Sequence, residues 1–253
     1  MKVLTHLLAI VVGAAAVFFL VQQRMARVAH ERAVLELIHT KAIVEKRLED
    51  QAAELTERLQ AFADRVANDR DFAMKLIVDQ EPSAPQVSEV ASRYVAVMGA
   101  DLLAVTDSTH TLLSCGHFPA AAGNSVADKA ALLDTEPVFL YDNIKGEQVL
   151  TRQARVDLTI AETVSLSCLG GCIVDEQYLR ELAPRENLRM LFRYGDTTIG
   201  ADSIEAISEI TDNTMIVNDT TYLATSLKLQ HAGELEAPEI IILADRPPAP
   251  SLF

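Results

Sequence analysis

The sequence LLAVTDSTHTLLSCGHFPAAAGNS, residues 102–125, carries the clearest local pattern in this chain of 253 residues. Two short apolar runs, 102–106 and 111–115, flank the polar residues 107–110, whose Asp, Ser and Thr side chains favour a tight turn by hydrogen bonding to the backbone. The pattern predicts a β-hairpin followed by a glycine-containing loop. Ser125 is the predicted N-cap of a short helix over 126–133.

Short apolar segments separated by turns continue downstream, as is typical of antiparallel sheets. A helix predicted over 175–183, and stopped by Pro184, divides these segments into two groups. We therefore expect an α+β protein with two small antiparallel sheets. The first sheet should add strands over 138–141, 146–157 and 162–168, and the second should use 188–194, a short strand from Ile199, 205–210, 215–217, 220–229 and 240–243.

Upstream of the sheets, residues 21–80 contain no glycine or proline and are rich in good helix formers. They predict one long helix, and a second helix over 86–98 should end at Gly99. An apolar seam of 3.5-residue period predicts either packing on the protein's own domain or pairing with a second copy, and we expect both. The seam consists of Leu48, Ala52, Leu55, Leu59, Phe62 and Val66.

Residues 3–21 form an apolar run whose only polar members are Thr5 and His6. As a helix, 19 residues extend about 28 Å, close to the ~30 Å hydrocarbon core of a bilayer. This predicts a membrane anchor over residues 1–22. A cleaved signal peptide is the alternative, but the apolar run continues past its small residues at 14–16, which favours the anchor. The count of Lys and Arg on the two sides, taken alone, would place the body inside the cell.

Composition excludes several classes of function. The net charge of −14 disfavours nucleic acid as a partner, since a duplex binds basic surfaces. The chain also lacks Gly-x-Ser-x-Gly, His-Glu-x-x-His and phosphate-loop motifs. We therefore expect no catalytic residues and no cofactor.

The chain has three cysteines, Cys115, Cys168 and Cys172, and an odd number does not indicate a disulfide framework. We expect buried free thiols. A local bridge between Cys168 and Cys172 is one alternative, and a metal site that combines the three cysteines with His117 is another, although the spacing fits no standard zinc pattern.

The residues Leu103–Asp107, Cys115–Pro119 and Gly123–Ser125 resemble the motifs of Cache domains, the PAS-like extracytoplasmic sensors of bacterial membrane histidine kinases and chemoreceptors. Gly170-Gly171 followed by Val174-Asp175 is similar to the junction after the first sheet of such sensors. The resemblance covers nearly the whole chain, although each motif is short. The chain has no Trp, so the amino-acid-binding pattern of many such sensors is not recognisable.

The resemblance implies a double-module sensor whose body lies outside the cytoplasmic membrane, against the Lys and Arg count. No second membrane helix or kinase motif is recognisable up to Phe253, so the chain is expected to be part of a longer receptor or a sensor that signals through a partner. The implied division is an anchor over 1–22, a helical stalk over 23–84, a membrane-distal module over 85–172, a membrane-proximal module over 173–246 and a Pro-rich tail over 247–253.

The resemblance also places the ligand against the first sheet, under the loop that follows the hairpin. An Arg, a Tyr and a His together could bind a carboxylate. Alternation along a strand should place Arg152 and Arg155 on opposite faces. Each residue also has an ordinary structural role open to it, such as a solvated Arg or a His that bonds its own loop. The candidate ligand-binding residues are His117, Arg93, Tyr94, Arg152 and Arg155.

Two functions follow from these observations. The first is a sensory input region that binds a small molecule, and any kinase output would lie beyond residue 253. The second is a membrane-anchored coiled-coil protein whose globular part docks a protein partner. Convergent polar groups in a pocket under the His117 loop would favour the first function, whereas a filled core and an exposed apolar patch would favour the second.

Overall fold

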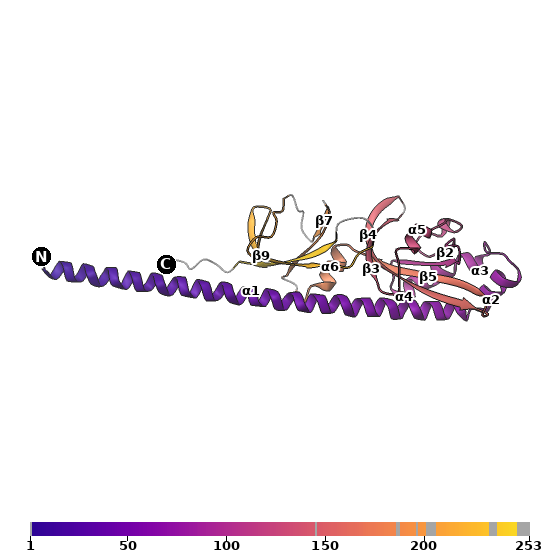
Figure 1. Cartoon of the computed structure of the whole chain (residues 1–253), viewed down its shortest axis with the longest axis horizontal. Helices are drawn as coiled ribbons and strands as arrows, with labels where there is room; N and C mark the ends of the chain where they lie inside the picture. Colours follow the sequence, from indigo (N-terminus) through magenta and orange to yellow (C-terminus); the bar gives the residue numbers. More distant parts are fainter. Residues whose placement is uncertain are drawn as a thin grey trace.

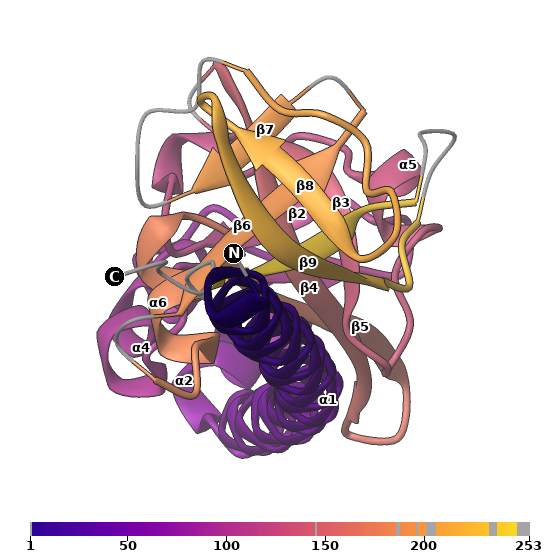
Figure 2. The ribbon, with the colours of Figure 1, turned by 90° about the vertical axis from the view of Figure 1, so that its left-hand side faces the viewer.

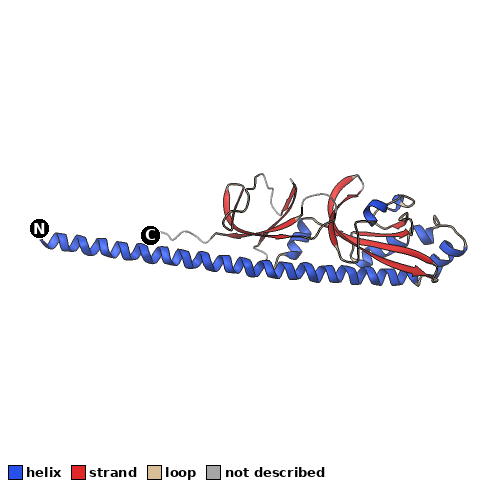
Figure 3. Ribbon diagram, in the orientation of Figure 1, coloured by secondary structure: helices blue, strands red, loops and turns tan. Residues whose placement is uncertain are grey.

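The structure, a computed structural model, describes residues 2–144, 146–185, 188–195, 197–200, 206–232 and 237–246. Its main feature is a single helix, α1 (Lys2–Ala67), of 66 residues, which corresponds to about 100 Å. Two sheets lie in a row along this helix, one at its C-terminal end and the other beside its middle (Figures 1 and 3). Viewed from the end, α1 runs along one side of both sheets (Figure 2).

Most side chains of the predicted anchor lie outside the described residues, because those of residues 1–12, 14 and 15 are not described. The anchor therefore stays a prediction. Within the part of the chain that the structure describes, no helix is apolar over a length that would cross a bilayer. The predicted tail over 247–253 also lies outside the described residues.

The two sheets have the same strand order and are antiparallel throughout. The first sheet follows β2-β1-β5-β4-β3, and the second follows β7-β6-β10-β9-β8. The first contains β1 (Leu102–Asp107), β2 (Leu112–Cys115), β3 (Val138–Ile144), β4 (Glu147–Ile160) and β5 (Val164–Ile173). The second contains β6 (Arg189–Tyr194), β7 (Thr197–Gly200), β8 (Thr214–Val217), β9 (Thr220–Lys228) and β10 (Glu239–Asp245).

The predicted seam of α1 faces the protein's own sheets. Leu59, Phe62 and Val66 are buried in the core of the first sheet. Leu48, with Leu37 and Val44 upstream, is buried in a second core that includes residues of both sheets. The helix therefore joins the two sheets into one body, and pairing with a second copy stays a prediction.

The long helix ends earlier than predicted. It stops at Ala67, and Asp69 then caps α2 (Arg70–Ala73) by accepting a hydrogen bond from the backbone N–H of Phe72. A π-helical turn, η1 (Met74–Val78), follows. The sequence hides this break because no glycine or proline marks it.

The second predicted helix is divided into α3 (Pro85–Ser88) and α4 (Val90–Met98), which ends at Gly99 in the left-handed conformation, as expected. The hydroxyl of Ser114 on β2 joins the two pieces. Its Oγ accepts from the backbone N–H of Ala91 at 3.0 Å and donates to the carbonyl of Ser88 at 2.8 Å. A side chain distant in sequence therefore stabilises the break.

Strand β5 runs five residues past its predicted end at Cys168 and contains both Gly170 and Gly171. A Cβ at Gly170 would lie 2.8 Å from Leu59 Cδ1 of α1, and one at Gly171 would lie 2.3 Å from the carbonyl oxygen of Arg152. These glycines therefore permit close packing inside the sheet and do not mark a loop.

Between the sheets, α6 (Glu176–Leu182) begins at Asp175, whose carboxylate accepts from the backbone N–H of Tyr178 at 2.9 Å. Residues 206–210, predicted as part of a strand, form only an isolated bridge from Ile207 to Val217 within their described portion. Short helical turns η2 (Pro119–Ala121) and α5 (Ala127–Ala130) complete the first module.

Candidate functional site

The two faces of the first sheet have different covers. On the helix face, Leu103, Val105 and Ala154 pack against α1 and α4. On the loop face, the connection over 116–137 crosses the sheet and carries η2 and α5. The apolar part of the loop face consists of Ala104, Leu112, Leu133, Val138, Leu140 and Leu169.

Backbone hydrogen bonds hold this connection to the sheet at both ends. Gly123 N–H donates to the carbonyl of Leu112 at 2.7 Å, and Leu112 N–H donates to Asn124 at 2.9 Å. At the other end, Arg155 N–H donates to the carbonyl of Asp134 at 2.7 Å. The connection is therefore a fixed cover over the loop face.

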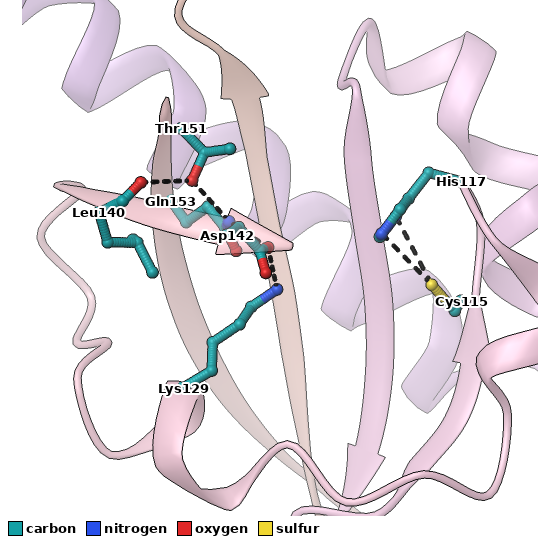
Figure 4. A network of polar contacts seen from close by, with 7 residues as sticks. All are labelled: Cys115, His117, Lys129, Leu140, Asp142, Thr151 and Gln153. Atoms are coloured by element: carbon teal, nitrogen blue, oxygen red, sulfur yellow. Dashed lines mark hydrogen bonds and ion pairs between the residues drawn. The ribbon is translucent and has the colours of Figure 1, made fainter. Parts of the chain in front are cut away.

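A polar cluster lies beneath this cover (Figure 4). Lys129 Nζ of α5 lies 2.6 Å from Asp142 Oδ2 of β3, and Gln153 Nε2 of β4 donates to the same oxygen at 2.8 Å. Gln153 Nε2 also lies 2.8 Å from Thr151 Oγ1, which donates to the carbonyl of Leu140 at 3.0 Å. Thr151 and Gln153 are buried, and the Lys129 and Asp142 side chains are 21% and 13% exposed.

His117 lies at the entrance of the covering connection, next to Cys115 at the end of β2 (Figure 4). Its Nε2 is 3.5 Å from the sulfur of Cys115. Burial raises the pKa of the Cys115 thiol, while the Lys129 ammonium and a backbone N–H lower it and offset part of that rise. Cys115 therefore remains a neutral thiol. Because Cys115 pairs with Ala104 of the loop face, His117 beside it lies on the same face as the polar cluster.

The predicted opposite placement of Arg152 and Arg155 is confirmed. Arg155 lies on the loop face, where its Nη1 donates to the carbonyl of Ala130 at 2.9 Å and its Nε lies 3.3 Å from Asp157. Arg152 is buried on the helix face, where its guanidinium lies over the ring of Phe139 at 5.1 Å.

Arg93 and Tyr94 lie on α4, which packs with α1 on the helix face. Tyr94 makes an edge-on ring contact with Phe62 at 5.6 Å. Arg93 Nη2 donates to the carbonyl of Gln86 and lies 3.8 Å from Asp69. The structure thus brings His117 and Arg155 to the loop face, and it does not bring Arg93, Tyr94 or Arg152 to them.

Sequence reasoning missed Lys129, Asp142 and Gln153. One signal was present in β4, where Thr151, Gln153 and Arg155 alternate and therefore share a face of a central strand. A run of polar side chains on one face of a central strand is unusual unless those side chains have partners. Lys129 and Asp142 come from other elements, so their meeting depends on the tertiary fold.

The cysteines do not form the alternatives considered above. All three are free, and Cys115 and Cys168 are buried. Burial raises the pKa of the Cys172 thiol to about 11. Among the described residues, no group of three or more His, Cys, Asp or Glu side chains is placed to hold a metal ion.

Comparison with solved structures gives the fold an independent reference. The periplasmic domain of LuxQ from Vibrio cholerae is 10% identical, with 83% of this chain and 99% of that chain covered and a TM-score of 0.55. The sensor domain of the histidine kinase DctB from the same organism is 9% identical, with 88% and 100% covered and a TM-score of 0.53. The sensory domain of the Campylobacter jejuni chemoreceptor Tlp3 is 10% identical, with 87% and 96% covered and a TM-score of 0.56.

The chain has the fold of a bacterial periplasmic sensor domain. The expected resemblance to Cache-type, PAS-like sensors is therefore confirmed at the level of fold, with two antiparallel sheets along one long helix. No protein-family model and no curated protein sequence matches the chain. At identities near 10%, the comparison establishes the fold and does not identify a ligand. Any ligand has to be inferred from the residues of this chain.

Proposed function

We propose that the chain is the extracytoplasmic input region of a bacterial membrane receptor, of the histidine kinase type, that binds a small molecule on the loop face of the first sheet. The observation that carries the proposal is the Lys129–Asp142–Gln153 cluster, partly buried beneath a fixed cover. Tlp3, a neighbour in fold, binds isoleucine and L-valine in its solved complexes. The solved neighbours are sensor domains, which agrees with an input region that has no catalytic residues of its own.

The chemistry of the loop face suits a small polar ligand with a carboxylate. Lys129 supplies an ammonium and His117 a ring nitrogen, while Asp142 offers an acceptor for a hydroxyl or ammonium group. The surrounding apolar residues would exclude water and so strengthen these contacts. His117 and Arg155 are proposed as ligand-binding residues on this basis, with Lys129, Asp142 and Gln153 added to them.

Signal transfer is proposed to follow α1. The helix touches both sheets and continues toward the predicted anchor, so a ligand that favours one of two packings of the first sheet would shift the position of the helix. We propose that the anchor holds the chain in the inner membrane, with its body in the periplasm, and that the chain forms a homodimer through α1. The exposed apolar side chains that support pairing are Val21, Met25, Val28 and Leu35.

These exposed side chains also favour a second function, in which the chain is an anchored interaction protein. Val21, Met25 and Val28 are 50%, 64% and 39% exposed along one helix. A surface of that kind would accept a partner helix without any small-molecule ligand. The first function requires the loop face to bind a small molecule, whereas the second requires no ligand there.

The test is a thermal-shift screen of the full chain, in detergent, against small carboxylates, amines and sugars. A ligand at about 100 times its dissociation constant should add about 2.7 kcal/mol to the free energy of unfolding. The shift should vanish in Asp142→Ala and His117→Ala and persist in the matched control Lys46→Ala, whose side chain forms an exposed pair with Asp50. No shift with any compound, together with capture of a partner by α1, would favour the interaction protein.

A further inference from the structure

A cavity of about 200 Å³ lies on the helix face, at the junction of the two modules. It is bounded by α1, the residues after α4, the end of β5, and α6. Its polar and charged lining side chains are those of Gln51, Glu54 and Arg58 from α1, Arg152 from β4, and Tyr178 and Glu181 from α6. The sheet separates this cavity from the loop face, so it is a different site from the one proposed above.

Arg152 gives the cavity a buried positive charge. The residue is 7% exposed, and its Nη1 donates to Tyr178 Oη at 3.3 Å. Its Nε is buried with no hydrogen-bond partner. Among the described residues, no carboxylate forms an ion pair with it. A buried guanidinium without an ion pair is costly, so an anionic group bound beside Arg152 would add to the contacts that Tyr178 and the ring of Phe139 already make with it.

Gln51 adds a hydrogen-bond acceptor that has no donor to the lining of the same cavity. Its Oε1 is buried and has no partner within the described structure. Arg58, in contrast, is already paired with Glu54 and also reaches the carbonyl of Met98. Arg152 and Gln51 thus each bring to the cavity lining one buried polar atom without a hydrogen-bond partner, Nε and Oε1 respectively.

We propose that this junction cavity is a second binding site, for a small carboxylate that carries a hydroxyl or ammonium group. The carboxylate would accept from Arg152 Nε, and the hydroxyl or ammonium would donate to Gln51 Oε1. A volume of about 200 Å³ equals that of about seven water molecules at ~30 Å³ each. It therefore suits a hydroxy acid or amino acid of a few carbons.

The position of the cavity gives such a ligand contact with both modules. Arg47 Nη1 on α1 donates to the carbonyls of Leu182 and Ala183 at the end of α6, at 3.2 and 2.7 Å. The helix α6 joins the two sheets, and Arg152 also lines a larger cavity of about 800 Å³ between α1, β3 and β9. A ligand on Arg152 would therefore fix α1 and α6 relative to the first sheet.

The test measures binding of defined probes to the full chain by calorimetry and thermal shift. L-Lactate and L-alanine supply both groups, acetate supplies only the carboxylate, and methylammonium supplies only the cation. At least one of L-lactate and L-alanine should bind with a dissociation constant of about 1 mM or lower. Acetate should bind at least about tenfold more weakly, and methylammonium should not bind.

Variants then locate the site. Arg152→Met should weaken binding at least about tenfold, and Gln51→Leu should remove the advantage of L-lactate or L-alanine over acetate. Arg152→Lys keeps the charge without the Nε–H and should also bind weakly, which preserves the test if Arg152→Met fails to fold. Lys46→Met removes only an exposed pair with Asp50 and is the control that should leave this binding unchanged, whereas Lys129→Met tests whether the probe binds at the loop face instead.

The outcomes separate the two sites. Binding that survives Arg152→Met but is lost in Lys129→Met would overturn the junction site and support the loop face. Binding lost in Arg152→Met and retained in Lys129→Met would support the junction site whatever the loop face does. Failure of both L-lactate and L-alanine to bind would overturn the junction proposal and leave a cavity that holds only water.

Discussion

The two sheets share a strand order, but their outer faces differ. The first sheet carries the Lys129–Asp142–Gln153 cluster beneath the 116–137 connection. On the corresponding face the second sheet carries ion pairs of Arg193 with Glu239 and Glu209 beside a larger apolar cluster, built from Leu191, Met215, Val217, Tyr222, Ala224, Ile241 and Leu243. Strand pairing therefore sets the topology of both modules, while the outer-face side chains give each module its own polar cluster, Lys129–Asp142–Gln153 in the first and Arg193–Glu239–Glu209 in the second.

The central strands differ as well. In the first sheet, Gly170 on β5 pairs with Leu103, and the neighbouring α1 side chain would collide with any Cβ there. In the second, β10 carries Ile240, Ile241 and Ile242 and pairs with β6. Gly170 thus lets Leu59 of α1 approach β5 closely in the first module, whereas in the second module Ile240 and Ile242 fill the core shared with α1.

The largest expected effect is that of Gly171→Ala. Its Cβ would approach the carbonyl oxygen of Arg152 to 2.3 Å, and because a backbone atom cannot move aside easily we expect a loss of about 3 kcal/mol in the free energy of unfolding. Gly170→Ala meets a side-chain methyl of Leu59 and should cost less. Urea unfolding followed by far-UV circular dichroism measures both, and equal losses would contradict the assignment of the close contact to the backbone.

Asp142→Ala tests the polar outer face of the first sheet. The change leaves Lys129 and Gln153 without their shared acceptor, and we expect a loss of about 2 kcal/mol. The double variant Lys129→Met/Asp142→Leu replaces the ion pair by apolar side chains, and it should recover most of this stability. If the double variant is as unstable as Asp142→Ala in urea unfolding, the loss of stability in Asp142→Ala does not come from leaving Lys129 without its ion-pair partner.

Arg47→Met tests the link between α1 and α6. Loss of the guanidinium leaves the terminal carbonyls of α6 without a donor and should cost about 1.5 kcal/mol. Hydrogen exchange should accelerate more in β6 and β10, which share a core with α6, than in β1 and β5. Lys46→Met removes only an exposed pair and is the control, with a change near zero. Equal acceleration in both sheets would show that α6 does not hold the second module specifically.

Much of the fold could be predicted from local sequence. The hairpin around Asp107, the helix start at Asp175 and the end of α4 at Gly99 follow from side chains that act on their own neighbours. The break at Asn68 and the continuation of β5 through Gly170 could not be predicted in this way. The continuation of β5 depends on packing against Leu59 of α1, which is distant in the sequence, whereas the break is marked only by the cap at Asp69, with no glycine or proline beside it.

The candidate site likewise combines features that local sequence predicts with features that only the tertiary fold creates. Alternation along β4 correctly placed Arg152 and Arg155 on opposite faces, because that geometry is local. The assignment of Arg93 and Tyr94 to the same site as His117 required knowing which face α4 covers, and the structure places α4 on the other face. Lys129 reaches Asp142 only because the covering connection folds across the sheet.

The smallest expected effect is that of Asp107→Ala, which tests how the two modules close their first hairpins. Asp107 Oδ1 accepts from the backbone N–H groups of Thr109 and Thr111, both at 2.9 Å, whereas Gly195, with φ of +54°, turns the β6–β7 hairpin. Loss of the Asp107 hydrogen bonds should cost about 1 kcal/mol.

This cost should depend on pH. Burial acts to raise the pKa of Asp107, but the hydrogen bonds from Thr109 and Thr111 outweigh it and hold the pKa below its usual value. The carboxylate therefore stabilises the fold fully above its unfolded pKa of about 3.9, and this contribution is lost as the pH falls through the lower, folded pKa. In urea unfolding, the difference between the original chain and Asp107→Ala should shrink from about pH 6 to about pH 3. Gly195→Ala involves no titrating group, so its cost of about 1 kcal/mol in the free energy of unfolding should stay constant over that range. If the cost of Asp107→Ala also stays constant, the carboxylate charge does not stabilise the hairpin.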